Sequence, residues 1–119
     1  MKNKAKDILL KILGIIDYRK DRSLFADKFI DLIFRQAFLK VVKNLPFDKK
    51  KQLDERLKNK NLDDSLKILL EYVAKEDFEK AVERISLEMF IDYIQQIMPA
   101  LSPERKNKLT AYLNKLQNQ

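Results

Sequence analysis

Apolar residues recur at helical spacing along nearly the whole chain, and they are densest in two long segments. In residues 24–45 they cover most of the helix circumference and leave a narrow polar stripe centred on Asp31. This pattern predicts a central, largely buried helix. Residues 78–98 carry one broad apolar face, which predicts a second long helix beside the first, with a break near Ser86 as an open alternative.

Capping and proline signals divide the chain into about six segments. Ser102 can cap a helix that has Pro103 at its first position and continues to about residue 116. Asn61 marks a second helix start, because two acidic residues follow it in the first turn. Pro46 and Pro99 are each expected to end the preceding helix, because proline disfavours α geometry in the residue before it.

The two halves of the chain resemble each other at an offset of 56 residues. Pairs at this offset include Phe34 with Phe90, Val41 with Ile97, Leu45 with Leu101, and Leu53 with Leu109. A helix, long helix, helix unit is therefore predicted to occur twice, as pseudo-repeats over residues 5–57 and 61–113. The alternative is that leucine-rich amphipathic helices align by chance, since solenoids usually need three or more repeats.

Composition supports the same fold class. The chain has one Gly and three Pro among 119 residues, while 36% of its residues are charged. Folds rich in tight turns need more glycine and proline, so this balance favours helices joined by short loops. We predict an all-α protein, a compact bundle of about five or six helices in a single domain over residues 1–119.

Catalytic chemistry is disfavoured because the chain has no His and no Cys. Imidazole and thiolate groups supply most proton transfer near neutral pH, most nucleophilic catalysis and most zinc binding. Neighbouring carboxylates such as Asp63 with Asp64, or Glu79 with Glu83, have ordinary surface spacing. The sequence predicts no enzyme, no catalytic residue, no metal site, no cofactor and no small-molecule substrate.

Localisation is inferred from the same composition. No apolar run approaches the roughly 20 residues that cross a bilayer, and residues 8–16 are interrupted by Lys11 and lack a cleavage signal. The absence of Cys is compatible with a reducing compartment. We expect a cytoplasmic protein.

Charge is distributed unevenly along the chain, whose formal net charge is +7. Residues 40–60 hold eight basic and three acidic side chains, whereas residues 61–98 hold four basic and nine acidic ones. The basic segment spans a helix end, a proline turn and the next helix, where several cations can share one face. The candidate partner-binding or phosphate-binding residues are Lys40, Lys43, Phe47, Lys49, Lys50, Lys51, Arg56, Lys58 and Lys60.

Two functional hypotheses follow. The first is a non-catalytic helical interaction module, an adaptor or small subunit of a larger assembly, which binds a protein partner or a second copy of itself. The alternative is a small basic nucleic-acid-binding accessory protein that contacts the phosphate backbone through its lysine-rich faces. Lysines that merely keep exposed helix faces soluble would give the same charge pattern.

The N-terminal segment, residues 5–18, is a basic amphipathic helix in character. Such a helix can lie on an anionic membrane surface. We instead expect its apolar face to close the bundle, because a small domain would otherwise leave a large apolar patch in water.

Overall fold

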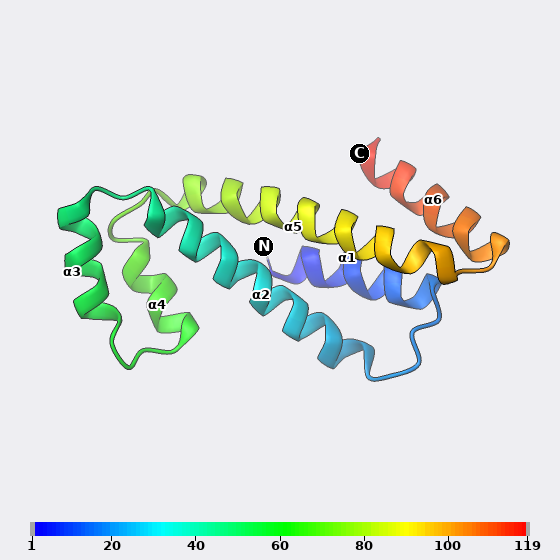
Figure 1. Ribbon diagram of the computed structural model, residues 1–119, viewed down its shortest axis with the longest axis horizontal. Helices are drawn as coiled ribbons and strands as arrows, with labels where there is room; N and C mark the ends of the chain where they lie inside the picture. The colour runs from blue at the N-terminus through cyan, green and yellow to red at the C-terminus, as the bar shows by residue number, and fades with distance from the viewer. Residues whose placement is uncertain (1, 119) are drawn as a thin grey trace. The chain divides into compact units, whose positions relative to one another are not determined.

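The computed structural model describes residues 2–118 and is all-α over that range, which confirms the predicted fold class (Figure 1). The helices are α1 (Lys2–Ile15), α2 (Arg22–Lys43), α3 (Phe47–Leu57), α4 (Leu62–Leu69), α5 (Lys75–Ile97) and α6 (Pro103–Gln117), with a short 3-10 helix, η1 (Met98–Ala100), between the last two. No helix in this range is long and apolar enough to span a bilayer.

The predicted helix starts are found where the capping residues place them. The Asn61 side chain accepts a hydrogen bond from the Asp64 amide at 2.8 Å, and Ser102 accepts one from the Arg105 amide at 3.3 Å. Each bond satisfies one of the first amides, which have no partner within the helix. Helix α5 runs through Ser86 without interruption, so the alternative of a break there is wrong.

The chain divides into two compact units, which we call unit 1 (residues 1–30 and 88–119) and unit 2 (residues 31–87). Helices α2 and α5 each contribute residues to both units, while α1 and α6 belong to unit 1 and α3 and α4 to unit 2. In unit 1, α1 packs against α6; in unit 2, α3 packs against α4.

The core of unit 1 is built on the apolar face of α1. Leu9 and Leu13 pack with Ala26 of α2, and Ile12 packs with Ile94 of α5 and Leu109 of α6. The amphipathic N-terminal segment therefore buries its apolar face in the bundle, as expected from its sequence. An aromatic layer covers this core. It consists of Tyr18, Phe25, Phe29, Phe90 and Tyr93, with ring centroids 4.9–5.9 Å apart.

The core of unit 2 contains one long-range aromatic pair, Phe34 of α2 with Phe78 of α5, whose centroids lie 6.0 Å apart. Leu53 of α3 and Leu69 of α4 are completely buried. The expectation that residues 24–45 form a largely buried helix is only partly correct, because Leu32 and Leu39 keep 49% and 66% of their surface exposed. The helix buries one face, and its second apolar face remains in contact with solvent.

Several pairs of residues at the 56-residue offset are buried in the structure. The buried residues Leu13, Ala26 and Leu53 correspond to the buried residues Leu69, Val82 and Leu109. Adding 56 to the residue numbers of α1 gives a range that includes α4, and adding 56 to those of α3 gives a range within α6. Each unit therefore contains one half of each pseudo-repeat. Duplication and the single-domain assignment themselves stay predictions.

Candidate functional site

Unit 2 contains an open groove between the C-terminal half of α2 and the N-terminal half of α5. Its volume is about 380 Å³. The lining residues are Lys40, Val41, Asn44, Leu45, Val73, Asp77, Lys80, Ala81 and Arg84. Four of them are small or medium-sized apolar residues, all half-buried, and they give the groove an apolar floor.

The rim of this groove is basic. Lys40, Lys80 and Arg84 are exposed, and Asp77 is the acidic residue among the lining side chains. Within residues 2–118, the ion pairs and hydrogen bonds found leave these three cations without a carboxylate partner. An apolar floor whose rim carries three cations and one carboxylate can hold an anionic group that also carries apolar surface.

Of the sequence-predicted site residues, Lys40 lines the groove. The lysines at positions 43, 49, 51, 58 and 60 are all exposed, and Lys50 is half-buried. Phe47, the first residue of α3, is 77% exposed. This is the largest exposed fraction among the large apolar side chains that are exposed in residues 2–118. The lysines are therefore available to a partner, but the structure does not gather them into one pocket.

Arg56 has a partner inside unit 2. Its guanidinium donates to both carboxylate oxygens of Glu71 at 3.2 and 2.9 Å and to the Tyr72 hydroxyl at 3.3 Å. The same guanidinium lies 5.7 Å from the centroid of the Tyr72 ring. The hydrogen bond to Glu71, followed by that to Tyr72, raises the pKa of Arg56, and the bond from Arg56 lowers the pKa of Glu71. This side chain connects α3 to the end of α4 and is less available to a partner than the neighbouring lysines.

Sequence reasoning missed Lys80 and Arg84, because both lie in a segment whose net charge is acidic. A signal was nevertheless present. Asp77, Lys80, Ala81 and Arg84 follow the spacing of three and four residues that places side chains on one helix face. Averaging charge over the whole segment concealed that one face of α5 is basic.

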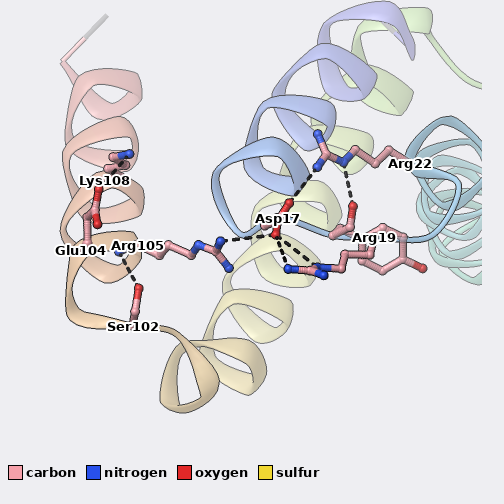
Figure 2. Close-up of polar contacts among 8 residues, drawn as sticks. Asp17, Arg19, Arg22, Ser102, Glu104, Arg105 and Lys108 are labelled. Atoms are coloured by element: carbon pink, nitrogen blue, oxygen red, sulfur yellow. Dashed lines mark hydrogen bonds and ion pairs between the residues drawn. The ribbon is translucent and has the colours of Figure 1, made fainter.

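The sequence also gave little indication of a polar cluster in unit 1, which Figure 2 shows centred on Asp17. Its carboxylate lies 3.3 Å from the guanidinium nitrogens of Arg19 and Arg105 and 3.5 Å from that of Arg22. Arg22 also donates to the Tyr18 carbonyl at 2.8 Å. Asp17 has a left-handed backbone (φ 57°) just after α1, and Arg105 comes from α6, 88 residues away. The cluster joins the end of α1 to α6.

Two tyrosines of unit 1 have altered acidity. Burial, followed by the nearby Tyr18, raises the pKa of Tyr93, and burial, followed by Asp7, raises the pKa of Tyr112. A raised pKa keeps a phenol protonated near neutral pH, so neither group is prepared to act as a base.

No three acidic side chains in the described part of the chain lie close enough together to hold a metal ion. Comparison of the chain with models of protein families, with curated proteins and with solved structures finds no match.

Proposed function

We propose that this chain is a non-catalytic helical interaction module that binds a protein partner through unit 2. One observation carries the proposal. Of the seven large apolar side chains found exposed in residues 2–118, five belong to unit 2 and two to unit 1. The five in unit 2 are Leu32, Leu39, Phe47, Leu70 and Leu87.

Exposed apolar surface of this kind supports binding for an energetic reason. Removing it from water gains about 25 cal/mol per Å², so a partner that covers several of these side chains recovers free energy that folding alone leaves unused. Phe47 and Leu39, which are 77% and 66% exposed, have the most surface to lose. Exposed cations beside them, such as Lys43 and Lys49, would steer an acidic partner toward this unit.

The test uses one substitution in each unit. Leu39→Ser removes an exposed leucine from unit 2, and Leu24→Ser removes one that is 51% exposed from unit 1. The wild-type chain and both variants are used as bait, and bound proteins are quantified by mass spectrometry. The captured candidate is then purified, and its affinity for each variant is measured by calorimetry.

We expect Leu39→Ser to weaken binding of the purified partner about tenfold, while Leu24→Ser binds as the wild type does. Equal affinities of the two variants for every purified partner would refute a role of unit 2. Sedimentation of the chain alone tests self-association. If the chain forms a dimer, Leu39→Ser should shift it toward the monomer and Leu24→Ser should not.

A second candidate function is supported by the exposed, unpaired lysines of α3 and the turn after it. Lys49, Lys51, Lys58 and Lys60 are open to solvent and have no carboxylate partner among the ion pairs of the described chain. They fit a protein that contacts the phosphate backbone without reading sequence.

Fluorescence anisotropy with labelled single-stranded RNA, single-stranded DNA and duplex DNA tests this candidate over a series from about 50 to 200 mM salt. Binding that falls steeply with salt, and that Lys50→Glu with Lys51→Glu removes, would favour it. Absence of binding at the lowest salt concentration would eliminate it.

A further inference from the structure

We infer that the groove of unit 2 is a docking site for an acidic helical segment of a partner, which inserts an aromatic side chain between α2 and α5. This inference rests on the proposed function, since it names the part of unit 2 that binds and the chemistry of what binds there. Three observations lead to it: the shape of the groove floor, the charge of its rim, and the way unit 1 fills the corresponding position.

The floor indicates an apolar anchor. The groove is lined by Val41 of α2, Leu45 in the turn after α2, Val73 just before α5 and Ala81 of α5, and all four are only half-buried. The Ala81 side chain is too small to cover this surface. The volume of about 380 Å³ lies within the range of sites that accept a small ligand or one large side chain.

Unit 1 shows what kind of group closes such a floor. The residue 56 positions before Ala81 is Phe25, which lies on α2. The Phe25 ring lies 4.9 Å from Tyr18 and 5.4 Å from Tyr93. At the same offset, Tyr18 is replaced by Ala74 and Tyr93 by Ala37. Of these three alanines, Ala81 lines the groove, so it is the position where a ring present in unit 1 is missing beside an open surface of unit 2. An aromatic ring from a partner would supply the missing group.

The rim selects for negative charge in the same partner. Lys40 lies on the α2 side of the groove, while Lys80 and Arg84 lie one helical turn apart on α5. Asp77 offsets one of these three charges. A partner helix with carboxylates one turn before and one turn after its aromatic residue would place them near both sides of the rim.

The experiment measures anisotropy of a fluorescein-labelled amphipathic peptide with Phe on its apolar face and Glu one helical turn away on either side, titrated with the full chain. One matched peptide replaces Phe with Ala, and another replaces both Glu with Gln. Three variants of the chain are compared. Ala81→Phe fills the floor, Lys80→Glu with Arg84→Glu reverses the rim, and Lys20→Glu with Lys28→Glu makes the same charge change at exposed positions of unit 1.

We expect the wild-type chain and the Lys20/Lys28 variant to bind the acidic aromatic peptide equally. Each altered peptide, and each of the two groove variants, should bind about tenfold more weakly or not at all. Circular dichroism checks that the variants are folded. If Ala81→Phe fails to fold, the rim variant and the two altered peptides still decide the result.

Several outcomes would overturn the inference. These are no binding by the wild-type chain, undiminished binding by Ala81→Phe, or equal binding of the Glu and Gln peptides. RNA binding that depends on Lys80 and Arg84 but tolerates Ala81→Phe would assign the rim to phosphate instead. A dimer in sedimentation that Ala81→Phe abolishes would assign the groove to a second copy of the chain.

Failure of this inference is distinguishable from failure of the proposed function. If a purified partner binds Ala81→Phe normally but still requires Leu39, unit 2 remains the binding unit and only the groove assignment is wrong. If neither substitution affects any partner, both proposals are wrong.

Discussion

Units 1 and 2 are built from equivalent helices, yet they differ in how those helices are covered. In unit 1, Phe25 and its aromatic neighbours fill the space beside α2 and α5. In unit 2, alanine occupies the positions that correspond to three of those aromatic residues, and a groove lies beside Ala81. Below this layer, the buried leucines Leu13 and Leu109 of unit 1 correspond to the buried leucines Leu69 and Leu53 of unit 2, whereas Ser65 stands at the position of the buried Leu9. The two units therefore share part of their core and differ most clearly in the outer aromatic side chains.

Polar contacts follow the same division. Asp17 of unit 1 contacts three arginines, which come from the loop after α1, from α2 and from α6. At the 56-residue offset, Val73 corresponds to Asp17 and Lys49 corresponds to Arg105. Since Val73 has no carboxylate, Lys49 has no acid at the corresponding position to pair with. Unit 2 instead uses the pair Arg56 and Glu71, where both side chains are largely exposed.

The comparison teaches that one helical frame can serve two purposes. Large aromatic side chains and a shared carboxylate connect the helices of unit 1, whereas small side chains leave a groove with unpaired cations in unit 2, which is the surface that we propose binds a partner. Because the frame depends on buried leucines that the two units share, the outer layer of unit 2 can change without loss of the fold.

The largest effect is expected at the shared frame. Leu53→Ala and Leu109→Ala each remove a completely buried side chain at equivalent positions, and each should lower the free energy of unfolding by about 3 kcal/mol. Urea unfolding followed by circular dichroism measures this, with exposed Leu39→Ala as a control that should change stability by less than about 0.5 kcal/mol. A large loss at only one of the two positions would show that the units do not share a frame.

A smaller effect is expected in the layer that distinguishes the units. Phe25→Ala should cost about 2 kcal/mol, because the ring is half-buried and contacts three other aromatic rings. Ala81→Phe should change stability by less than about 1 kcal/mol, because it adds a ring to an open groove rather than to a packed core. Chemical denaturation compares the two. A severe loss on Ala81→Phe would mean that the groove has no room for an aromatic group.

The Asp17 cluster should contribute less. Asp17→Asn keeps the shape and tolerates the left-handed backbone, but it removes the charge that holds three guanidinium groups together, at a cost of about 1 kcal/mol. The difference from the wild type should shrink in high salt, because screening weakens the repulsion among the arginines. Thermal unfolding at low and high salt measures both effects; a difference independent of salt would contradict this electrostatic account.

The smallest effect concerns the ion pair of unit 2. The bond from Arg56 lowers the pKa of Glu71 below the 4.5 of a free carboxyl, so its stabilisation is fully present above pH 4.5 and is lost as the pH falls through the folded-state pKa. Between about pH 5 and about pH 3, wild type should therefore lose slightly more stability than Glu71→Gln. Urea midpoints at the two pH values measure the difference. Equal losses would show that this pair contributes nothing, as many exposed pairs do.

Several features of the fold were predictable because they depend on local physics. The caps at Asn61 and Ser102 were identified from single residues, since a side-chain oxygen at that position satisfies a free amide. The long segments were recognised as helices from periodicity, although their ends lie one to three residues away from the predicted ones. Which face of α2 would remain exposed at Leu32 and Leu39 was not predictable, because both of its faces are apolar.

The candidate site was only partly predictable. Lys40 and Phe47 were selected from the basic, proline-interrupted segment, and the structure places the first at the groove and leaves the second exposed. Lys80 and Arg84 were missed, because a net charge over a window of sequence cannot show which face of a helix the charges share. Arg56 was selected for its charge, but its guanidinium donates a hydrogen bond to the carboxylate of Glu71, 15 residues later.

The helical character of this protein and the starts of its capped helices follow from the sequence, as does the recurrence of leucines at the 56-residue offset. These properties depend on backbone hydrogen bonding and apolar periodicity, which act over a few residues. The pairing of Asp17 with Arg105 across 88 residues, and the groove that Lys40 shares with Arg84, arise from tertiary packing. These contacts depend on which helix faces pack together. Side chains from distant parts of the chain must fill one space, so their volumes determine which faces can pack.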